Sequence, residues 1–256
     1  MLQDIINISK EAGELIRSRF NTKFALKFKT NESDLVTEVD NVSEKIIVDF
    51  IKKKYPTHGI ITEEGGTSLS TSEYNWVIDP LDGTVNFAHG LPIFAVSIGV
   101  QKNSETIVGI VYDVMQNVVY HAEKNNGSYE NGKRIRVNDN SNLRHALLVT
   151  GFPYDVRENP ENALGKFVAF TKAARGIRRL GSAAIDFCYV AKGVFDGFWE
   201  VHLKPWDMCA GKLIVKEAGG LVTDFEGNKI DIFSKRILAS NGKIHEAMIK
   251  VLKENP

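Results

Sequence analysis

The chain has 256 residues, and its 32 Lys and Arg residues balance 32 Asp and Glu residues, so the formal net charge is zero. This balance gives no overall attraction for nucleic acid or for an anionic membrane surface. The sequence has no long apolar run and no signal-peptide pattern, and its two cysteines do not suggest a disulfide framework. We therefore expect a cytoplasmic protein with no nucleic-acid or membrane partner.

In the first half of the chain, apolar periodicity predicts amphipathic helices at about 2–20 and directly after Asp40. The apolar face of the second helix is expected to carry Val42, Ile46, Ile47, Phe50 and Ile51. Short β-type runs follow at 59–62, 76–79, 94–100, 106–113 and 118–123. Turn signals come next, at 125–127 and 131–132.

In the second half, predicted strands alternate with predicted helices. The strands are expected at 146–150, 177–180, 195–201, 221–224 and 237–240. The helices are expected at 162–174, 182–192, 206–218 and about 243–253. Because sheets layered with helices bury both kinds of pattern, we expect an α+β fold. We expect a division near residue 140 to give two halves, 1–140 and 141–256, which pack into one compact unit.

The most informative stretch is the apolar run 76–78, which ends in Asp79-Pro80-Leu81-Asp82. Pro80 cannot extend a strand ladder, and Gly83 permits a sharp turn, so both carboxylates can face one point. Two carboxylates at one point repel each other unless a cation lies between them. Their hard oxygen ligands favour magnesium or manganese over zinc.

Two further acidic groups have simpler explanations when each is taken alone. Glu63-Glu64 is typical of a solvated loop, and Asp207 complements the dipole of a helix that begins after Pro205. An Asx-turn, by contrast, explains only one carboxylate of the Asp79–Asp82 pair.

Gly83-Thr84 follows the acidic pair and is expected to begin a helix, whose first amides can bind an anion. Cations beside such amides suit a phosphate group, so the residues favour metal-assisted hydrolysis of a phosphoester. The sequence contains no P-loop, no His-Glu-x-x-His zinc motif and no Gly-x-Ser-x-Gly elbow.

Residues 76–87, Trp-Val-Ile-Asp-Pro-Leu-Asp-Gly-Thr-Val-Asn-Phe, resemble the first signature motif of the inositol monophosphatase family. Residues 206–220 resemble its second motif. Three supporting segments occur in the family's order, at 34–40, 63–64 and 181–200. The resemblance covers essentially the whole chain. It implies a layered αβαβα sandwich of the inositol monophosphatase and fructose-1,6-bisphosphatase type. It also implies a magnesium-dependent, lithium-sensitive phosphatase that is cytoplasmic and homodimeric.

Carried over by motif, the resemblance assigns Glu63, Asp79 and the Leu81 carbonyl to a first Mg²⁺ ion. A second ion would be held by Asp79, Asp82 and Asp207, and Mn²⁺ could substitute. A third, weaker ion would bind through Glu63 and waters near the 27–33 loop, where Lys29 matches a family lysine.

The resemblance also assigns catalytic and substrate-binding roles. Glu63 and the Thr84 hydroxyl, which Asp40 orients, would position and deprotonate the attacking water. The amides of Gly83 and Thr84 would hold the phosphate. The full set of substrate-binding residues implied by the family comprises Leu81, Asp82, Gly83, Thr84, Gly181, Ser182, Ala183, Glu200 and Asp207.

The expected substrate is a small phosphorylated polyol or sugar, with myo-inositol 1-phosphate as the first choice. Fructose-1,6-bisphosphatase or dual-specificity activity is the nearest alternative. The basic cluster Arg175, Arg178 and Arg179 would then clamp a second phosphate, although it could equally be a solvated face. A nucleotide-3′-phosphatase is less favoured because that branch of the superfamily is usually longer. A non-catalytic, phosphate-binding regulatory protein is the alternative from another class. Asp186, on the helix predicted at 182–192, is expected to be structural.

Overall fold

The computed structural model describes residues 1–28, 35–68 and 70–256. Its α-helices are α1 Leu2–Arg19, α2 Glu38–Lys54, α3 Thr84–Ala88, α4 Ala163–Ala173, α5 Ala183–Ala191, α6 Pro205–Glu217 and α7 His245–Glu254. Its strands are β1 Leu26–Phe28, β2 Leu35–Thr37, β3 Gly59–Thr62, β4 Gly66–Ser68, β5 Tyr74–Asp82, β6 Ala95–Lys102, β7 Glu105–Asp113, β8 Val118–Glu123, β9 Gly127–Glu130, β10 Lys133–Ile135, β11 Leu147–Thr150, β12 Gly176–Arg178, β13 Gly197–Val201, β14 Leu221–Thr223 and β15 Arg236–Ser240. Short 3₁₀ turns occupy Leu143–His145, Val156–Glu158 and Pro160–Asn162.

The described strands form two main sheets. The larger has eight strands in the order β10-β9-β8-β7-β6-β5-β3-β4, and only its β3–β5 pair is parallel. The smaller has five strands in the order β12-β11-β13-β15-β14, of which the first three run parallel. A separate antiparallel ribbon joins β1 to β2.

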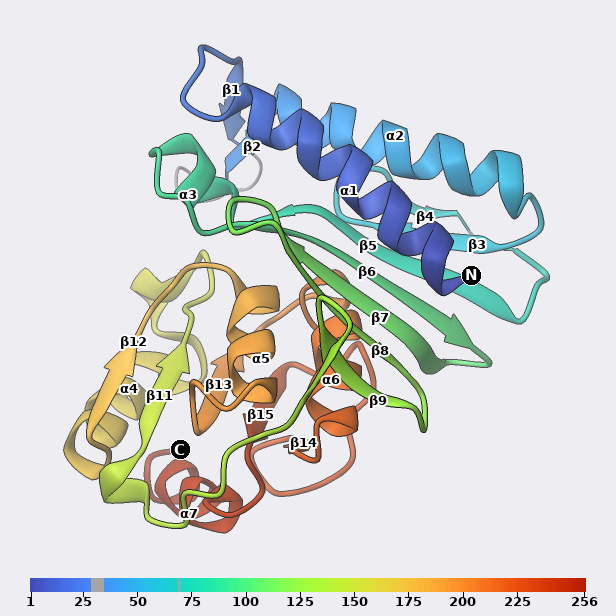
Figure 1. The fold of residues 1–256 in the computed structure, drawn as a ribbon. Helices are drawn as coiled ribbons and strands as arrows, with labels where there is room; N and C mark the ends of the chain where they lie inside the picture. The colour runs from blue at the N-terminus through green and yellow to red at the C-terminus, as the bar shows by residue number, and fades with distance from the viewer. Residues whose placement is uncertain (29–34, 69) are drawn as a thin grey trace.

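The helices and sheets stack in five layers (Figure 1). Helices α1 and α2 cover the outer face of the larger sheet, and α5 and α6 fill the space between the two sheets. Helices α4 and α7 cover the far face of the smaller sheet. The predicted layered α+β sandwich is therefore confirmed.

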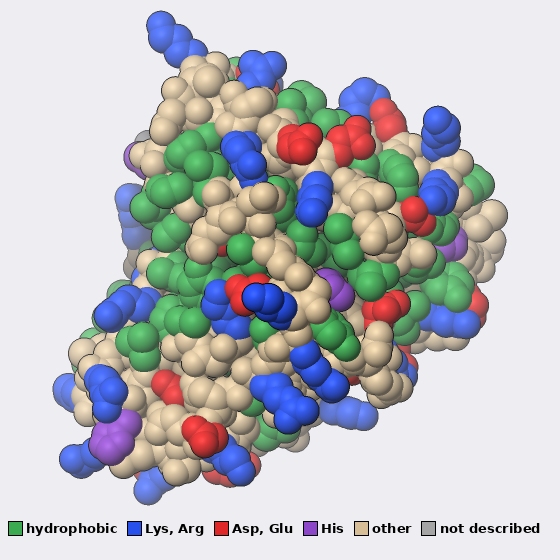
Figure 2. All heavy atoms as spheres, viewed as in Figure 1, with side chains coloured by type: hydrophobic (Ala, Val, Ile, Leu, Met, Phe, Trp, Pro, Cys, Tyr) green, Lys and Arg blue, Asp and Glu red, His purple; other side chains and the backbone are tan. Residues whose placement is uncertain are grey.

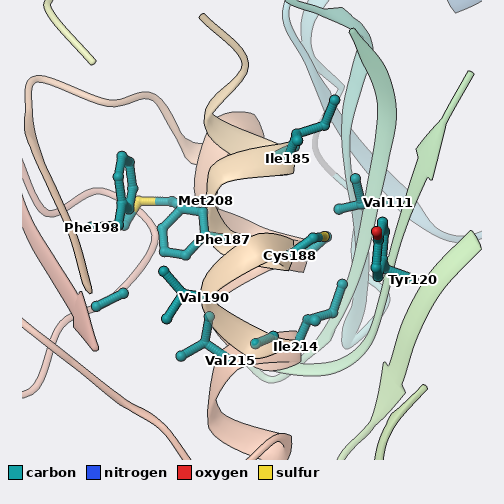
Figure 3. Close-up of a cluster of buried hydrophobic side chains, with 14 of the residues drawn as sticks. Val111, Tyr120, Ile185, Phe187, Cys188, Val190, Phe198, Met208, Ile214 and Val215 are labelled. Atoms are coloured by element: carbon teal, nitrogen blue, oxygen red, sulfur yellow. The ribbon is translucent and has the colours of Figure 1, made fainter. Parts of the chain in front are cut away.

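The middle layer holds the most apolar part of the core. From α5, Phe187 packs near Phe198 of β13, while Cys188 lies toward Val111 and Tyr120 of the larger sheet (Figure 3). Helix α5 can contact both sheets because it is apolar on nearly every face, as expected of a helix buried on two sides.

The structure departs from the predicted elements in three respects. Val42 was placed on the buried face of α2, but it is 47% exposed, and the buried face there carries Ser43 and Glu44 instead. Strand β5 does not stop at Asp79 but continues to Asp82 through a register shift. Five strands, β1, β2, β4, β9 and β10, were absent from the predicted elements, although both turn signals beside β9 and β10 are correct.

Both signs of charge are distributed over the visible face of the molecule (Figure 2). Within the described ranges, no helix is long and apolar enough to cross a membrane.

Candidate functional site

The irregular end of β5 positions the first two carboxylates. Asp79 pairs with Ser97 and Asp82 with Ala95, so the ladder to β6 shifts its register between the two aspartates. Pro80 lies inside this shift, where a residue without an amide hydrogen costs no ladder bond. The Leu81 amide donates to Asp79 Oδ1 at 3.0 Å. The bulge thus brings two aspartates, three positions apart, into one site.

Asp82 is also tied to the start of α5. Its Oδ2 accepts hydrogen bonds from the Ser182 hydroxyl and from the Ala184 amide, the latter at 2.8 Å. Ser182 is the N-cap of that helix. One carboxylate from the larger sheet therefore anchors a helix from the second half of the chain.

Asp207 enters the site from the first turn of α6. Its Oδ2 accepts from the Lys204 amide at 2.6 Å, so the helix-start role suggested by the sequence holds. The same side chain meets the β5 carboxylates, because ligand oxygens of Asp79, Asp82 and Asp207 lie within 4.8 Å of one another. One residue thus serves both as a helix cap and as a member of the acidic cluster.

Glu63 lies at the end of β3, which runs parallel to β5, so the carboxyl ends of both strands point toward the same place. The turn that carries it is held by Glu44 of α2. Glu44 Oε2 accepts from the Thr62 hydroxyl and from the Glu64 amide, the latter at 2.9 Å. The bonds to both neighbours of Glu63 fix the backbone from which its carboxylate reaches the site.

Burial and mutual repulsion make it unfavourable for the carboxyl groups of the acidic cluster to be charged together when no cation is bound. Burial, followed by the charges of Glu63, Asp82 and Asp207, raises the pKa of Asp79 well above its usual value. Burial also raises the pKa of Asp82 to about 6, and burial with the charge of Asp82 raises that of Asp207. Because a cation would favour the charged form of all these oxygens, the donor set fits a hard divalent ion such as Mg²⁺.

Thr84 and Asp40 form the second part of the site. The Thr84 hydroxyl lies 2.9 Å from Asp40 Oδ1 and 3.0 Å from the Leu81 carbonyl oxygen. Asp40 is fixed by a capping box at the start of α2, where its Oδ2 accepts from the amide and hydroxyl of Thr37 at 2.8 and 2.5 Å. Ser43 of the same helix donates to the Pro80 carbonyl at 2.9 Å.

Gly83 allows the sharp turn from β5 into the short helix α3. Its φ of +97° lies in the left-handed region that favours glycine. A Cβ at this position would lie 2.9 Å from the Ile93 carbonyl oxygen and 3.3 Å from that of Gly181. The chain therefore turns where three segments meet closely.

A pocket of about 460 Å³ connects these parts. Every predicted metal-binding and substrate-binding residue lines it, and Asp40 reaches it through Thr84. Of the arginine cluster only Arg179 lines it. Lys29 and Ser33, assigned to a third-ion loop, lie outside the described residues.

Glu200 of β13 also lines the pocket. Burial raises its pKa to about 8, against the opposing effect of the Arg179 charge. A Cβ on Gly151 would lie 2.3 Å from either carboxylate oxygen of Glu200, so the glycine leaves the space that this side chain occupies.

Sequence reasoning missed three contributors. Ser43 and Glu44 looked like ordinary polar positions of a helix, but their hydrogen bonds hold segments of the site. Asp186 was expected to be structural, and it lines the pocket. Thr37 and Asp40 carried a usable signal, because a Thr three residues before an Asp is close to a capping-box pattern.

Comparison with known proteins places this site in context. The profile of the inositol monophosphatase family matches residues 1–256. The chain is 42% identical to Nus factor SuhB of Salmonella typhimurium, over 99% of this chain and 96% of that protein. It is 40% identical to the chloroplastic phosphatase IMPL1 of Arabidopsis thaliana, over 97% of this chain and 69% of that one. An inositol monophosphatase structure from Anabaena superposes with a TM-score of 0.88 at 38% identity, covering 100% of this chain and 97% of that one.

Proposed function

Because this chain belongs to the inositol monophosphatase family, we propose that it hydrolyses small phosphate monoesters with Mg²⁺, and that myo-inositol 1-phosphate is its principal substrate. The observation that carries this proposal is the meeting of the Asp79–Asp82–Asp207 cluster with the Thr84–Asp40 pair in one pocket. The names of the phosphatase IMPL1 and of the Anabaena enzyme support the same reaction class.

Two or three Mg²⁺ ions would be held by Glu63, Asp79, Asp82, Asp207 and the Leu81 carbonyl, with Mn²⁺ as a possible substitute. When bound, these ions supply charge neutralisation and a lower pKa for the attacking water. The fit rests on the donor set, because several buried carboxylates with raised pKa values lie around one point.

Side chains and backbone amides of the chain orient the attacking water and the phosphate. The Thr84 hydroxyl donates a hydrogen bond to Asp40, so the Thr84 oxygen remains able to accept a hydrogen bond from the attacking water. Glu63 takes the second proton of that water as its oxygen attacks phosphorus. The amides of Gly83 and Thr84 donate to phosphate oxygens. The bond from phosphorus to the alcohol oxygen breaks, and a water near Asp207 gives a proton to the leaving oxygen. The proton held on Glu63 then returns to the hydroxide so formed, and the cycle consumes one water. Positioning and charge stabilisation dominate such transfers, so no covalent nucleophile is needed.

The leaving alcohol would contact Glu200 and the Gly181–Ala183 backbone, which line the same pocket. This placement favours inositol 1-phosphate over fructose 1,6-bisphosphate, because Arg175 and Arg178 do not line the pocket to clamp a second phosphate. A substrate panel with and without Mg²⁺ tests the proposal. Turnover of inositol 1-phosphate should exceed that of fructose 1,6-bisphosphate, and the reverse order would replace the proposed substrate.

A regulatory role is the second candidate function. It is favoured by the 42% identity to a protein named as a Nus factor, although no partner follows from that name alone. Such a role needs the fold and the phosphate pocket but not turnover. We also infer that the protein is cytoplasmic and forms a homodimer. Light scattering on the purified protein would test the dimer.

Substituting Asp82→Asn separates catalysis from a binding-only role. Asparagine keeps an acceptor for the Ser182 hydroxyl and the Ala184 amide but removes the charge from the cluster. Because a metal site is worth several kcal/mol in the transition state, we expect kcat to fall by about 10³-fold or more with little change in Tm. Activity near that of the wild type would contradict the metal-dependent account.

A further inference from the structure

Asp186 is a pocket residue to which the proposed mechanism gives no role. It lies four positions after the N-cap Ser182, so both side chains project from the same face of α5. The Asp186 amide donates to the Ser182 carbonyl at 3.0 Å, as expected of a regular first turn. Asp186 is only 1% exposed, yet it lines the same pocket as the β5 carboxylates and Glu200.

The carboxyl group of Asp186, unlike its amide, has no hydrogen-bonding partner that the described part of the chain supplies. Its Oδ1 is enclosed and accepts nothing. A buried carboxyl without a partner is costly, and native structures keep one where a ligand, water or function requires it. Asp113 shows that this fold can satisfy an equally buried aspartate, because its Oδ1 accepts from the Gln116 amide at 3.1 Å.

The surroundings of Asp186 are acidic. Burial, followed by the charges of Glu200 and Asp82, raises the pKa of Asp186, and the charge of Arg179 opposes this effect. Arg179 is exposed and forms no ion pair with any described carboxylate. The carboxyl groups of Asp186 and Glu200 can accept hydrogen bonds from the hydroxyl groups of a bound alcohol.

We propose that Asp186 is a second polyol-binding carboxyl, which acts with Glu200 to bind hydroxyl groups of the leaving alcohol. This inference rests on the proposed phosphatase function and deepens it, because it assigns a further residue to recognition of the leaving alcohol. A hydroxyl group of the substrate, or a water that it holds, would give the Asp186 carboxyl the hydrogen-bonding partner that the described residues do not supply.

The decisive quantity is the ratio of kcat/KM for myo-inositol 1-phosphate to that for p-nitrophenyl phosphate, which has no hydroxyl groups on its leaving group. This ratio does not depend on the fraction of folded enzyme. Asp186→Ala should lower it about tenfold through a higher KM for the inositol substrate. Asp186→Asn keeps an acceptor and should stay within threefold of the wild type.

Asp113→Ala is the matched control, because it removes an equally buried carboxyl outside the pocket. It should lower Tm without changing the substrate ratio. If Asp186→Ala does not fold, Asp186→Ser replaces it, since the shorter hydroxyl cannot reach the same position. An unchanged ratio in the folded variant, or an equal loss on both substrates, overturns the role of Asp186.

Calorimetry with a phosphonate analogue of inositol 1-phosphate separates this inference from the proposed function. Binding by the wild type without turnover of the substrate would overturn the phosphatase activity alone. Equal affinity of the wild type and Asp186→Ala for the analogue would overturn the role of Asp186 alone. A tenfold weaker affinity in Asp186→Ala supports it, and absence of binding by the wild type overturns both.

Discussion

Glu44 illustrates how a single residue outside the pocket can fix a carboxylate inside it. Both of its hydrogen bonds go to one oxygen, Oε2, from the residues on either side of Glu63. Glu44→Ala removes both bonds and frees the turn, so we expect the apparent affinity for Mg²⁺ to fall by about 10–100-fold, as for other groups that orient metal ligands. Titration of activity against Mg²⁺ measures this change.

Glu44→Gln is the matched control for that prediction. Its carbonyl oxygen can occupy the place of Oε2 and accept the same two bonds. It should bind Mg²⁺ within a few-fold of the wild type. If the glutamine and alanine variants lose affinity equally, the charge of Glu44 matters rather than its hydrogen bonds.

The acidic motifs were predictable from the sequence for a physical reason. Asp79 and Asp82 lie three positions apart on one strand end, so local geometry alone brings them together. Glu44 and Ser43 could not be assigned in this way, because they contact segments 20 and 37 positions away. On the helix they look like solvent-facing polar residues until the layer beneath is known.

At the scale of elements, α1 and α2 are joined by a polar contact at their ends. Asp4 accepts from Lys54 Nζ at 2.6 Å and from the Tyr55 hydroxyl at 2.7 Å. The hydrogen bond from Lys54, followed by that from Tyr55, lowers the pKa of Asp4 below its usual 3.8. Because the pair lies near the surface, we expect Asp4→Asn to reduce the free energy of unfolding at pH 7 by only about 0.5–1 kcal/mol.

The pH dependence of that contact has a definite sign. A carboxyl whose pKa is lower in the folded state stabilises the protein above its unfolded pKa, and the contribution is lost as pH falls through the folded value. The difference between wild type and Asp4→Asn should therefore shrink as pH falls below about 4. Urea unfolding at pH 7 and at several acid values checks this, and a difference that grows in acid would contradict it.

The ends of elements were harder to predict than their existence. Strand β5 passes through Pro80 because a bulge absorbs the missing donor, and no sequence pattern distinguishes a bulge from a strand end. Val42 is exposed because the buried face of α2 is partly polar. Ser43 and Glu44 occupy that face and form hydrogen bonds to segments of the site. Both errors lie beside the pocket, where function overrides the regular apolar pattern.

At the scale of the whole molecule, the middle layer belongs to both halves of the chain. Helix α6 comes from the second half, yet it packs against β6 and β7 of the first. Its approach is so close that a Cβ on Gly109 would lie 2.8 Å from the Ala210 carbonyl oxygen. Val111 and Tyr120 share one core cluster with Phe187 (Figure 3). The division near residue 140 therefore separates the two sheets but divides a single core.

This shared core predicts that the halves do not fold alone. A fragment of residues 1–140 would expose the apolar inner face of the larger sheet, and a fragment of 141–256 would expose one side of α5 and α6. Since each half loses the burial that stabilises it, we expect neither to melt cooperatively, whereas the full chain should unfold in one transition. Thermal melts followed by circular dichroism compare the two fragments with the full chain. Binding of a dye that recognises apolar surface shows how much of it each fragment exposes. A cooperative melt of the 1–140 fragment would show instead that the larger sheet and its outer helices are an independent domain, and that the pocket lies at an interface between two such domains.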